Sequence, residues 1–218
     1  MNRTTRWLIP VLGAGALALS ACSTTTPGSA QPSQAGETGG KPPSGAIDDV
    51  PGPGVPKVAA PIDFTNYLTK PCESLHSNQV DELLGENATP KPDLKAGAGP
   101  TCVWRKGSSQ AAVTVNFLTL VPIGATKPMG LTGYYNNREK DFKFFEVLPS
   151  IDGYPAIAYG VKDERKTEGV CTVATGTSDR YAFNVAINLS PGNIATKDPC
   201  EYAKKVAGEV LANIKGGH

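Results

Sequence analysis

The chain has 218 residues, with 21 basic and 20 acidic side chains and a formal net charge of +1 at pH 7. Nucleic-acid-binding proteins need a basic face and attraction to anionic lipid needs a polybasic patch, so this charge balance argues against both. Beyond the first 21 residues, no stretch is long and apolar enough to cross a bilayer.

Residues 1–21 predict a lipoprotein signal peptide. Arg3 and Arg6 precede an apolar run over residues 7–19, which is the order of segments in a secretory signal. The run has 13 residues, too few for a helix that spans the hydrocarbon core. The signal ends in Leu-Ser-Ala-Cys, a lipobox that closes at Cys22. We expect Cys22 to be acylated and to hold the protein on the extracytoplasmic face of the cell membrane; the alternative is an ordinary signal peptide that leaves this cysteine unmodified.

Residues 22–60 predict a lipidated cysteine followed by a disordered tether. They are rich in Pro, Gly, Ser and Thr, and no aromatic residue occurs between Cys22 and Phe64. Such a segment cannot bury enough apolar surface to offset its ordering entropy. As a flexible coil it would reach roughly 35 Å r.m.s.. Residues 61–218 then form a single domain of ordinary size.

Four cysteines remain within this domain, and an even number in an exported chain predicts two disulfides. Four cysteines allow three pairings. We favour Cys72 with Cys102 and Cys171 with Cys200, because each pair closes a loop of about 30 residues between neighbouring elements. No Cys-x-x-Cys motif occurs, and His76 and His218 are the only histidines. We therefore expect no metal site and no cofactor.

Apolar periodicity predicts the elements of the domain in chain order. A short helix over residues 77–84 has Ser77 as its candidate N-cap. Residues 86–99 are rich in Pro, Gly, Lys and Ala, which is typical of a loop. Residues 101–106 and 111–120 alternate apolar and polar side chains and predict a hairpin.

The next elements are a short helix, a hairpin that turns at Asp152-Gly153, and two further strands. Their predicted ranges are 131–140 for the helix, 142–148 and 154–161 for the hairpin, and 169–175 and 181–189 for the strands.

The last element is an amphipathic helix with Asp198 as its N-cap and Pro199 at its first position. One face of it is apolar and consists of Cys200, Ala203, Ala207, Val210, Leu211 and Ile214. Such a stripe needs a partner surface. The sequence therefore predicts an α+β fold: an antiparallel sheet of about five or six strands, covered on one face by the N-terminal short helix and the C-terminal amphipathic helix.

Several short motifs stand together in the order that one known family shows. They are Pro71-Cys72, Cys102-Val103-Trp104-Arg105, Gly153-Tyr154-Pro155-Ala156, Cys171-Thr172-Val173 and Asp198-Pro199-Cys200. With the lipobox and the tether, the chain resembles the actinobacterial lipoproteins grouped as domain of unknown function 3558, over roughly residues 60–215. The resemblance implies an envelope lipoprotein, and it adds no catalytic residue and no ligand.

Candidates for catalysis are few. Histidine-dependent hydrolysis would have to use His76, which we interpret instead as a surface or capping residue. A glycosidase-like hydrolase would need two carboxylates across a cleft. Five acids around the second predicted hairpin are possible members of such a pair: Asp141, Glu146, Asp152, Asp163 and Glu164. Their places at turns and strand ends favour solvated charge.

Binding is the better-supported function class. We interpret Trp104 as a core residue beside Cys102, and we take Tyr134, Tyr135 and Phe142 as a possible binding surface, because aromatic residues in irregular segments often mark recognition sites. The sequence thus favours a non-enzymatic, membrane-anchored binding module whose partner is another envelope protein, a glycolipid or a small apolar ligand. The alternatives are a carboxylate-dependent cell-wall hydrolase and an accessory or sensory subunit of an envelope complex.

Overall fold

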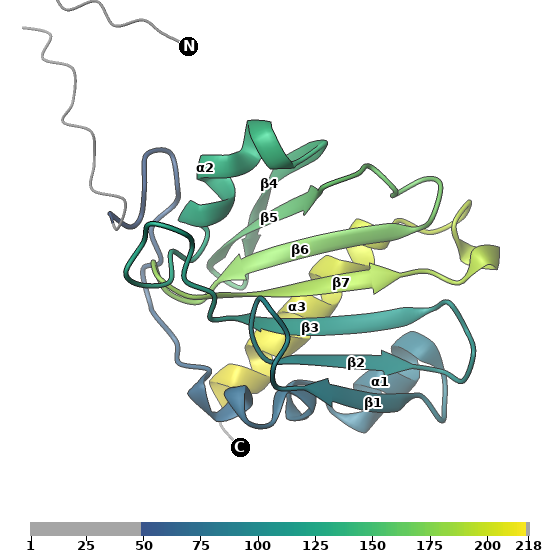
Figure 1. Ribbon diagram of the computed structural model, residues 1–218. Helices are drawn as coiled ribbons and strands as arrows, with labels where there is room; N and C mark the ends of the chain where they lie inside the picture. Colours follow the sequence, from purple (N-terminus) through teal and green to yellow (C-terminus); the bar gives the residue numbers. More distant parts are fainter. Residues whose placement is uncertain (1–48, 217–218) are drawn as a thin grey trace, which may run out of the picture. The chain divides into compact units, whose positions relative to one another are not determined.

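The computed structural model describes residues 49–216; the predicted signal peptide, Cys22 and most of the predicted tether lie outside this range. A single antiparallel sheet has the strand order β1-β2-β3-β7-β6-β5-β4 (Figure 1). The strands are β1 (Thr89–Asp93), β2 (Thr101–Arg105), β3 (Ala112–Leu118), β4 (Phe144–Ile151), β5 (Tyr154–Gly160), β6 (Val170–Gly176) and β7 (Ala182–Asn188). The antiparallel sheet is confirmed, but the prediction of five or six strands was wrong, because the sheet has seven.

The additional strand is β1, which the sequence analysis assigned to a loop. Its sequence, Thr-Pro-Lys-Pro-Asp, contains two prolines, and proline cannot donate a hydrogen bond to a neighbouring strand. Pro90 and Pro92 are two residues apart and lie on an edge strand that pairs only with β2. In an edge strand, the N–H groups of alternate residues point away from the neighbouring strand and form no hydrogen bond with it. β1 can therefore contain both prolines.

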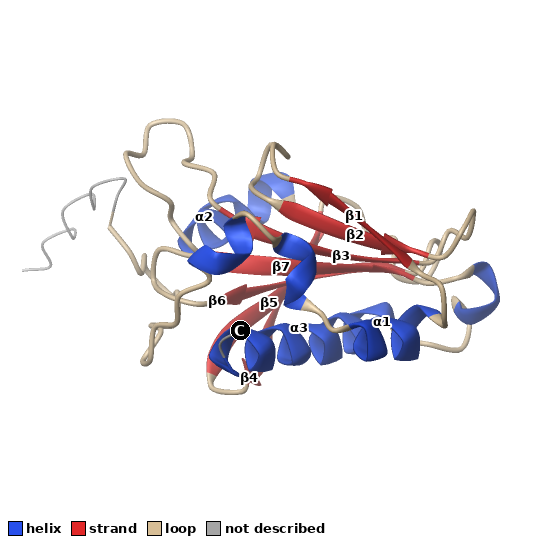
Figure 2. Cartoon of the chain, turned by 90° about the horizontal axis from the view of Figure 1, so that it is seen from below, coloured by secondary structure: helices blue, strands red, loops and turns tan. Residues whose placement is uncertain are grey.

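Three α-helices and three short 3-10 helices accompany the sheet. The α-helices are α1 (Ser77–Leu84), α2 (Thr132–Asp141) and α3 (Pro199–Gly216), and the 3-10 helices are η1 (Thr65–Leu68), η2 (Pro71–Ser74) and η3 (Pro191–Asn193). Figure 2 shows α1 and α3 on the same face of the sheet, as predicted, with α2 on the opposite face. The sheet is therefore partly covered on its second face as well.

The main core lies between the sheet and α3. Asp198 Oδ1 accepts a hydrogen bond from the Cys200 N–H at 2.8 Å, so the helix begins where the sequence predicts. The predicted apolar face is confirmed as buried, and the buried side chains of α3 include Cys200, Ala203, Val206, Ala207, Val210, Leu211 and Ile214. They pack on inward-facing residues such as Phe117 and Phe183, which have no exposed surface. Burial of each large aliphatic side chain stabilises the fold by about 1.5–3 kcal/mol.

Both predicted disulfides are present. Cys72 is bonded to Cys102 and Cys171 to Cys200, with Cα atoms 5.1 Å apart in each pair. The first joins η2 to β2, and the second joins β6 to the first turn of α3. Each disulfide therefore links a helical segment to the sheet, which is the arrangement of neighbouring elements that the favoured pairing assumes.

Residues 50–60, which composition places in the tether, make specific contacts with the domain. Val58 is 4% exposed and belongs to the main core. Its N–H donates to Asp179 Oδ1 at 2.9 Å, and the Gly52 N–H donates to Thr132 Oγ1 at 3.0 Å. A proline-rich segment without secondary structure can thus pack where neighbouring loops supply hydrogen-bond acceptors.

Candidate functional site

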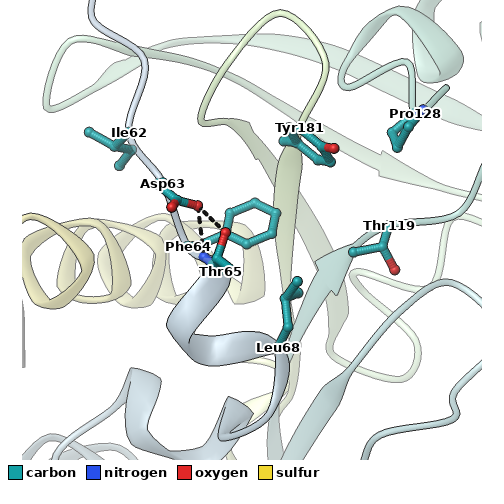
Figure 3. Close-up of a pocket in the computed structure, with 8 residues that line it drawn as sticks. All are labelled: Ile62, Asp63, Phe64, Thr65, Leu68, Thr119, Pro128 and Tyr181. Carbon is teal, nitrogen blue, oxygen red and sulfur yellow. Dashed lines mark hydrogen bonds between the residues drawn. The ribbon is translucent and has the colours of Figure 1, made fainter.

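An apolar pocket of about 210 Å³ lies beside η1, at the end of the sheet where the chain enters the domain. Figure 3 shows its lining residues, which are Ile62, Asp63, Phe64, Thr65, Leu68, Thr119, Pro128 and Tyr181. They come from three places in the sequence: the segment leading into η1, the loop after β3, and the turn before β7. The pocket is therefore a product of the tertiary fold.

The floor and one wall of the pocket are aromatic. Phe64 is buried, and its ring centroid lies 5.1 Å from that of Phe117 and 5.8 Å from that of Tyr181. Tyr181 is 42% exposed and forms the open wall. Edge-to-face and tilted ring pairs at these distances are favourable beyond their apolar burial. The rings of Phe64 and Tyr181 thus give the pocket an apolar surface.

The segment that forms the pocket is anchored to α3 through a buried hydrogen-bond network. Tyr67 in η1 donates its hydroxyl to the Asn213 carbonyl at 3.1 Å. Asn213 Nδ2 in turn donates to the Ser74 carbonyl at 2.9 Å and to Gln79 Oε1 at 2.8 Å. Because a buried amide must keep its partners, this network fixes η1, η2 and α1 relative to the C-terminal helix. The η1 side of the pocket is consequently held in place by α3.

Asp63 is the single carboxylate among the lining residues. Its Oδ1 accepts hydrogen bonds from the hydroxyl and the N–H of Thr65, and these bonds lower the pKa of the Asp63 carboxyl below its usual value. The carboxylate is therefore ionised at neutral pH and is engaged in starting η1. This arrangement suits a structural acceptor and gives the pocket no general acid.

Exposed hydrophobic side chains lie at the same end of the sheet as the pocket. Of the seven large hydrophobic residues that the structure describes as exposed, five lie in the loops at this end of the sheet, and we call them the apolar rim: Leu94, Leu120, Val121, Ile123 and Tyr181. The pairing register places their loops at one end of the sheet, since β1 ends opposite the start of β2, and Leu118 at the end of β3 pairs with Ala182 at the start of β7. Single exposed hydrophobic residues are common, but five at one end of a sheet make that end a candidate contact surface.

The aromatic residues predicted as a binding surface are brought together as a small packed cluster. Tyr135 is 7% exposed, and its ring meets Phe145 at a centroid distance of 5.1 Å. Tyr134 lies between Phe142 at 6.0 Å and Tyr159 at 4.7 Å, and both Tyr134 and Phe142 are half-buried. These rings fill the space between α2 and the second face of the sheet. The cluster therefore serves first to pack α2 onto β4 and β5.

Comparison with known protein families gives one match. The family described as protein of unknown function DUF3558 matches residues 17–213. The chain belongs to the DUF3558 family. No curated protein and no solved structure matches it significantly, so neither the pocket nor the apolar rim of this DUF3558 protein takes a role from a relative.

The aromatic cluster of the DUF3558 domain has a polar centre. Asn184 Nδ2 donates to the Tyr159 hydroxyl at 3.1 Å, and this hydroxyl lies 3.4 Å from that of Tyr134. Burial raises the pKa of Tyr134, and it raises the pKa of Tyr159 well above the usual value. Both phenols are therefore neutral at physiological pH, and the Tyr159 hydroxyl donates to that of Tyr134.

The residues weighed for catalysis lie apart from the pocket. His76 is the N-cap of α1, and its N–H donates to Gln79 Oε1 at 2.7 Å, so it is a capping residue one position before the predicted Ser77. Trp104 is 3% exposed in the main core, as interpreted from the sequence. Within residues 49–216 no helix is long and apolar enough to cross a bilayer, and no three potential metal ligands gather.

Four of the five weighed carboxylates take part in ion pairs at the surface. Arg165 pairs with Asp163 at 2.8 Å and with Glu146 at 2.9 Å, and this guanidinium lowers the pKa of the Asp163 carboxyl. Asp152 pairs with Lys215, and Glu164 pairs with Lys162; Asp141 is the exposed last residue of α2. Four of these acids are therefore engaged in surface ion pairs, and none of the five lines the pocket.

Sequence reasoning missed the pocket and the rim. Periodicity predicted the strand that ends near Leu120 but gave no reason to examine the residues after it. One signal was available: Leu-Val-Pro-Ile over residues 120–123 is apolar, yet it stands among prolines and glycines that prevent a strand or helix. An apolar run in a loop has few places to be buried, so it is a candidate for an exposed contact surface.

Proposed function

We propose that this protein is a lipid-anchored, non-enzymatic binding module of the cell envelope, and that the pocket beside η1 is its binding site. The observation that supports the proposal most directly is the pocket itself, with its aromatic floor, its apolar lining and its fixed carboxylate. The ligand it suits is a small apolar group, such as the end of the acyl chain of a glycolipid.

Size and chemistry support this ligand class. Pockets that enclose drug-sized ligands have volumes of about 300–1,000 Å³, whereas this pocket has about 210 Å³. The pocket is therefore large enough to enclose only part of a drug-sized ligand. Phe64, Leu68 and Tyr181 offer apolar surface, and Asp63 Oδ1 accepts two hydrogen bonds from Thr65. An apolar chain end fits this combination better than a sugar, which needs several free polar partners.

The proposed anchorage rests on the lipobox at residues 19–22, and the two disulfides are consistent with an oxidising compartment outside the cytoplasm. Mass spectrometry of the membrane fraction is expected to find a diacylglyceryl adduct on Cys22, since two acyl chains are needed for stable anchoring. Unmodified mature protein in the culture medium would contradict the anchor and leave the pocket proposal to be tested separately.

Filling the pocket is expected to abolish ligand binding. Thr119 is a lining residue with a partly exposed side chain, and Thr119→Phe places a ring in the open volume. Fluorescence titration with the neutral apolar probe N-phenyl-1-naphthylamine, using residues 22–218, should show at least about a tenfold weaker affinity than the parent, because the probe and the new ring compete for the same space.

Thr114→Phe is the matched control for this experiment. Thr114 lies on β3, the strand that Thr119 directly follows; it is also partly exposed, and it does not line the pocket. It should bind the probe as the parent does. Equal probe affinity in Thr119→Phe and Thr114→Phe would remove the pocket from consideration.

A further inference from the structure

We propose that the apolar rim docks on the surface of a lipid bilayer, so that the mouth of the pocket opens onto the membrane. The proposal rests on the lipid anchor in the proposed function and adds an orientation of the domain. It differs from the anchor in that the contact is made by side chains of the folded domain: Leu94, Leu120, Val121, Ile123 and Tyr181.

The central part of the rim is held in a defined shape. The N–H groups of Thr119 and Leu120 donate to the Ala98 carbonyl at 3.1 and 3.2 Å, and the Ala125 N–H donates to the Pro122 carbonyl at 3.0 Å. These bonds tie the loop after β3 to the loop after β1 and close a turn at its tip. Ile123, at that tip, is fully exposed. The loop thus projects an isoleucine that belongs to neither hydrophobic cluster of residues 49–216.

The first described residues of the chain lie at the end of the domain that carries the rim. Residues 50–62 run along the same end of the domain, where the Val58 N–H donates to Asp179 and the Ile62 N–H donates to the Thr177 carbonyl at 2.9 Å. Figure 1 shows this segment and the loops after β1 and β3 at the same end of the sheet. A lipid at Cys22 would therefore pull on the domain from the end that carries the rim.

The length of chain between Cys22 and the domain permits this contact. Residues 22–48 number 27, and a chain of that length spans at most about 90 Å. An anchor within that span keeps the rim close to the bilayer, which raises its effective concentration there. Weak insertion of a few aliphatic side chains is then sufficient to orient the domain.

Charges at this end are compatible with a headgroup layer. Lys95 and Lys127 are exposed in the two rim loops, where they would meet anionic headgroups. The acids nearby are engaged with backbone N–H groups: Asp93 with Lys95 at 2.9 Å and Asp179 with Val58. Two lysines and two aspartates at this end offset each other in charge, so the apolar side chains of the rim make the proposed contact.

Tryptophan quenching by brominated lipid tests the orientation. Residues 22–218 would be coupled through Cys22, the one cysteine of this segment outside the disulfides, to a maleimide phospholipid in phosphatidylglycerol–phosphatidylethanolamine vesicles with dibrominated acyl chains. We expect Ile123→Trp to show blue-shifted emission quenched at least twofold relative to unbrominated vesicles. Quenching should persist in 0.5 M NaCl, because apolar insertion is not screened.

Val161→Trp is the matched control, since Val161 is 66% exposed but lies in the loop after β5, at the other end of the sheet. Its emission should be unchanged by bromination. Equal quenching at the two positions, or none at either, would overturn the proposal. So would a parent protein that dimerises in sedimentation equilibrium and becomes monomeric on Ile123→Ser, because the rim would then be a contact between copies of this chain. Chemical coupling at Cys22 makes the result independent of whether cells lipidate this residue, and the Thr119→Phe titration reports on the pocket alone.

Discussion

Replacing Cys171 and Cys200 together by alanine is expected to lower the free energy of unfolding by about 3–4 kcal/mol. The disulfide closes a loop with a sequence separation of 29 residues, and the loss of that constraint restores chain entropy to the unfolded state by about this amount. Both cysteines are buried, and the bond fixes the first turn of α3 to β6. Urea denaturation followed by circular dichroism, with the slope of the transition fitted freely, measures the change.

The Cys72–Cys102 pair is the natural comparison. Its sequence separation is 30 residues, so chain entropy predicts nearly the same loss for its double alanine variant. Any difference between the two variants then reports the packing of the sulfur atoms in the folded state. A loss below about 1 kcal/mol for the Cys171 and Cys200 double variant would contradict the account, because neither the loop entropy nor the buried packing would be contributing.

The elements that the sequence predicts well are those whose pattern is local. In β7, Phe183, Val185 and Ile187 point to the core and are buried, whereas Asn184 and the intervening alanines face the other side. Period-2 alternation of this kind identifies a strand regardless of its neighbours. The turn at Asp152-Gly153 is equally local, since both residues have positive φ, of 51° and 86°, as a two-residue hairpin turn requires.

The features that the sequence could not predict depend on tertiary neighbours. β1 has the composition of a loop, and it is a strand because β2 offers it an edge. The pocket joins Phe64 to Thr119 and Tyr181, which are widely separated in the sequence, and no periodicity relates them. Tyr134, Tyr135 and Phe142 lie together, and their role as a binding surface stays a prediction. Their burial depends on how α2 lies on the second face of the sheet, which the sequence analysis left open.

Alanine at Tyr134, Tyr135 and Phe142 together is expected to lower the free energy of unfolding by about 3–5 kcal/mol, with most of the loss from Tyr135. Removing a buried aromatic ring costs about this much, through lost apolar burial and the cavity left behind. Tyr135 contacts Phe145 edge to face, and Tyr134 stands between Phe142 and Tyr159. A surface patch without a packing role would leave the urea midpoint unchanged, so urea denaturation separates the two roles.

Tyr135→Phe is the control, because it keeps the ring against Phe145 and should cost less than about 1 kcal/mol. Val147→Ala, at a side chain that is 60% exposed on β4, should change stability by no more than about 0.5 kcal/mol. A triple variant with the parent's urea midpoint would show that these rings do not hold α2 to the sheet.

If the triple variant loses stability as expected, any reduction in its partner binding reports loosening of α2. A recognition role is then better tested at the pocket and the apolar rim, where the variants Thr119→Phe and Ile123→Ser change partly or fully exposed side chains outside both hydrophobic cores.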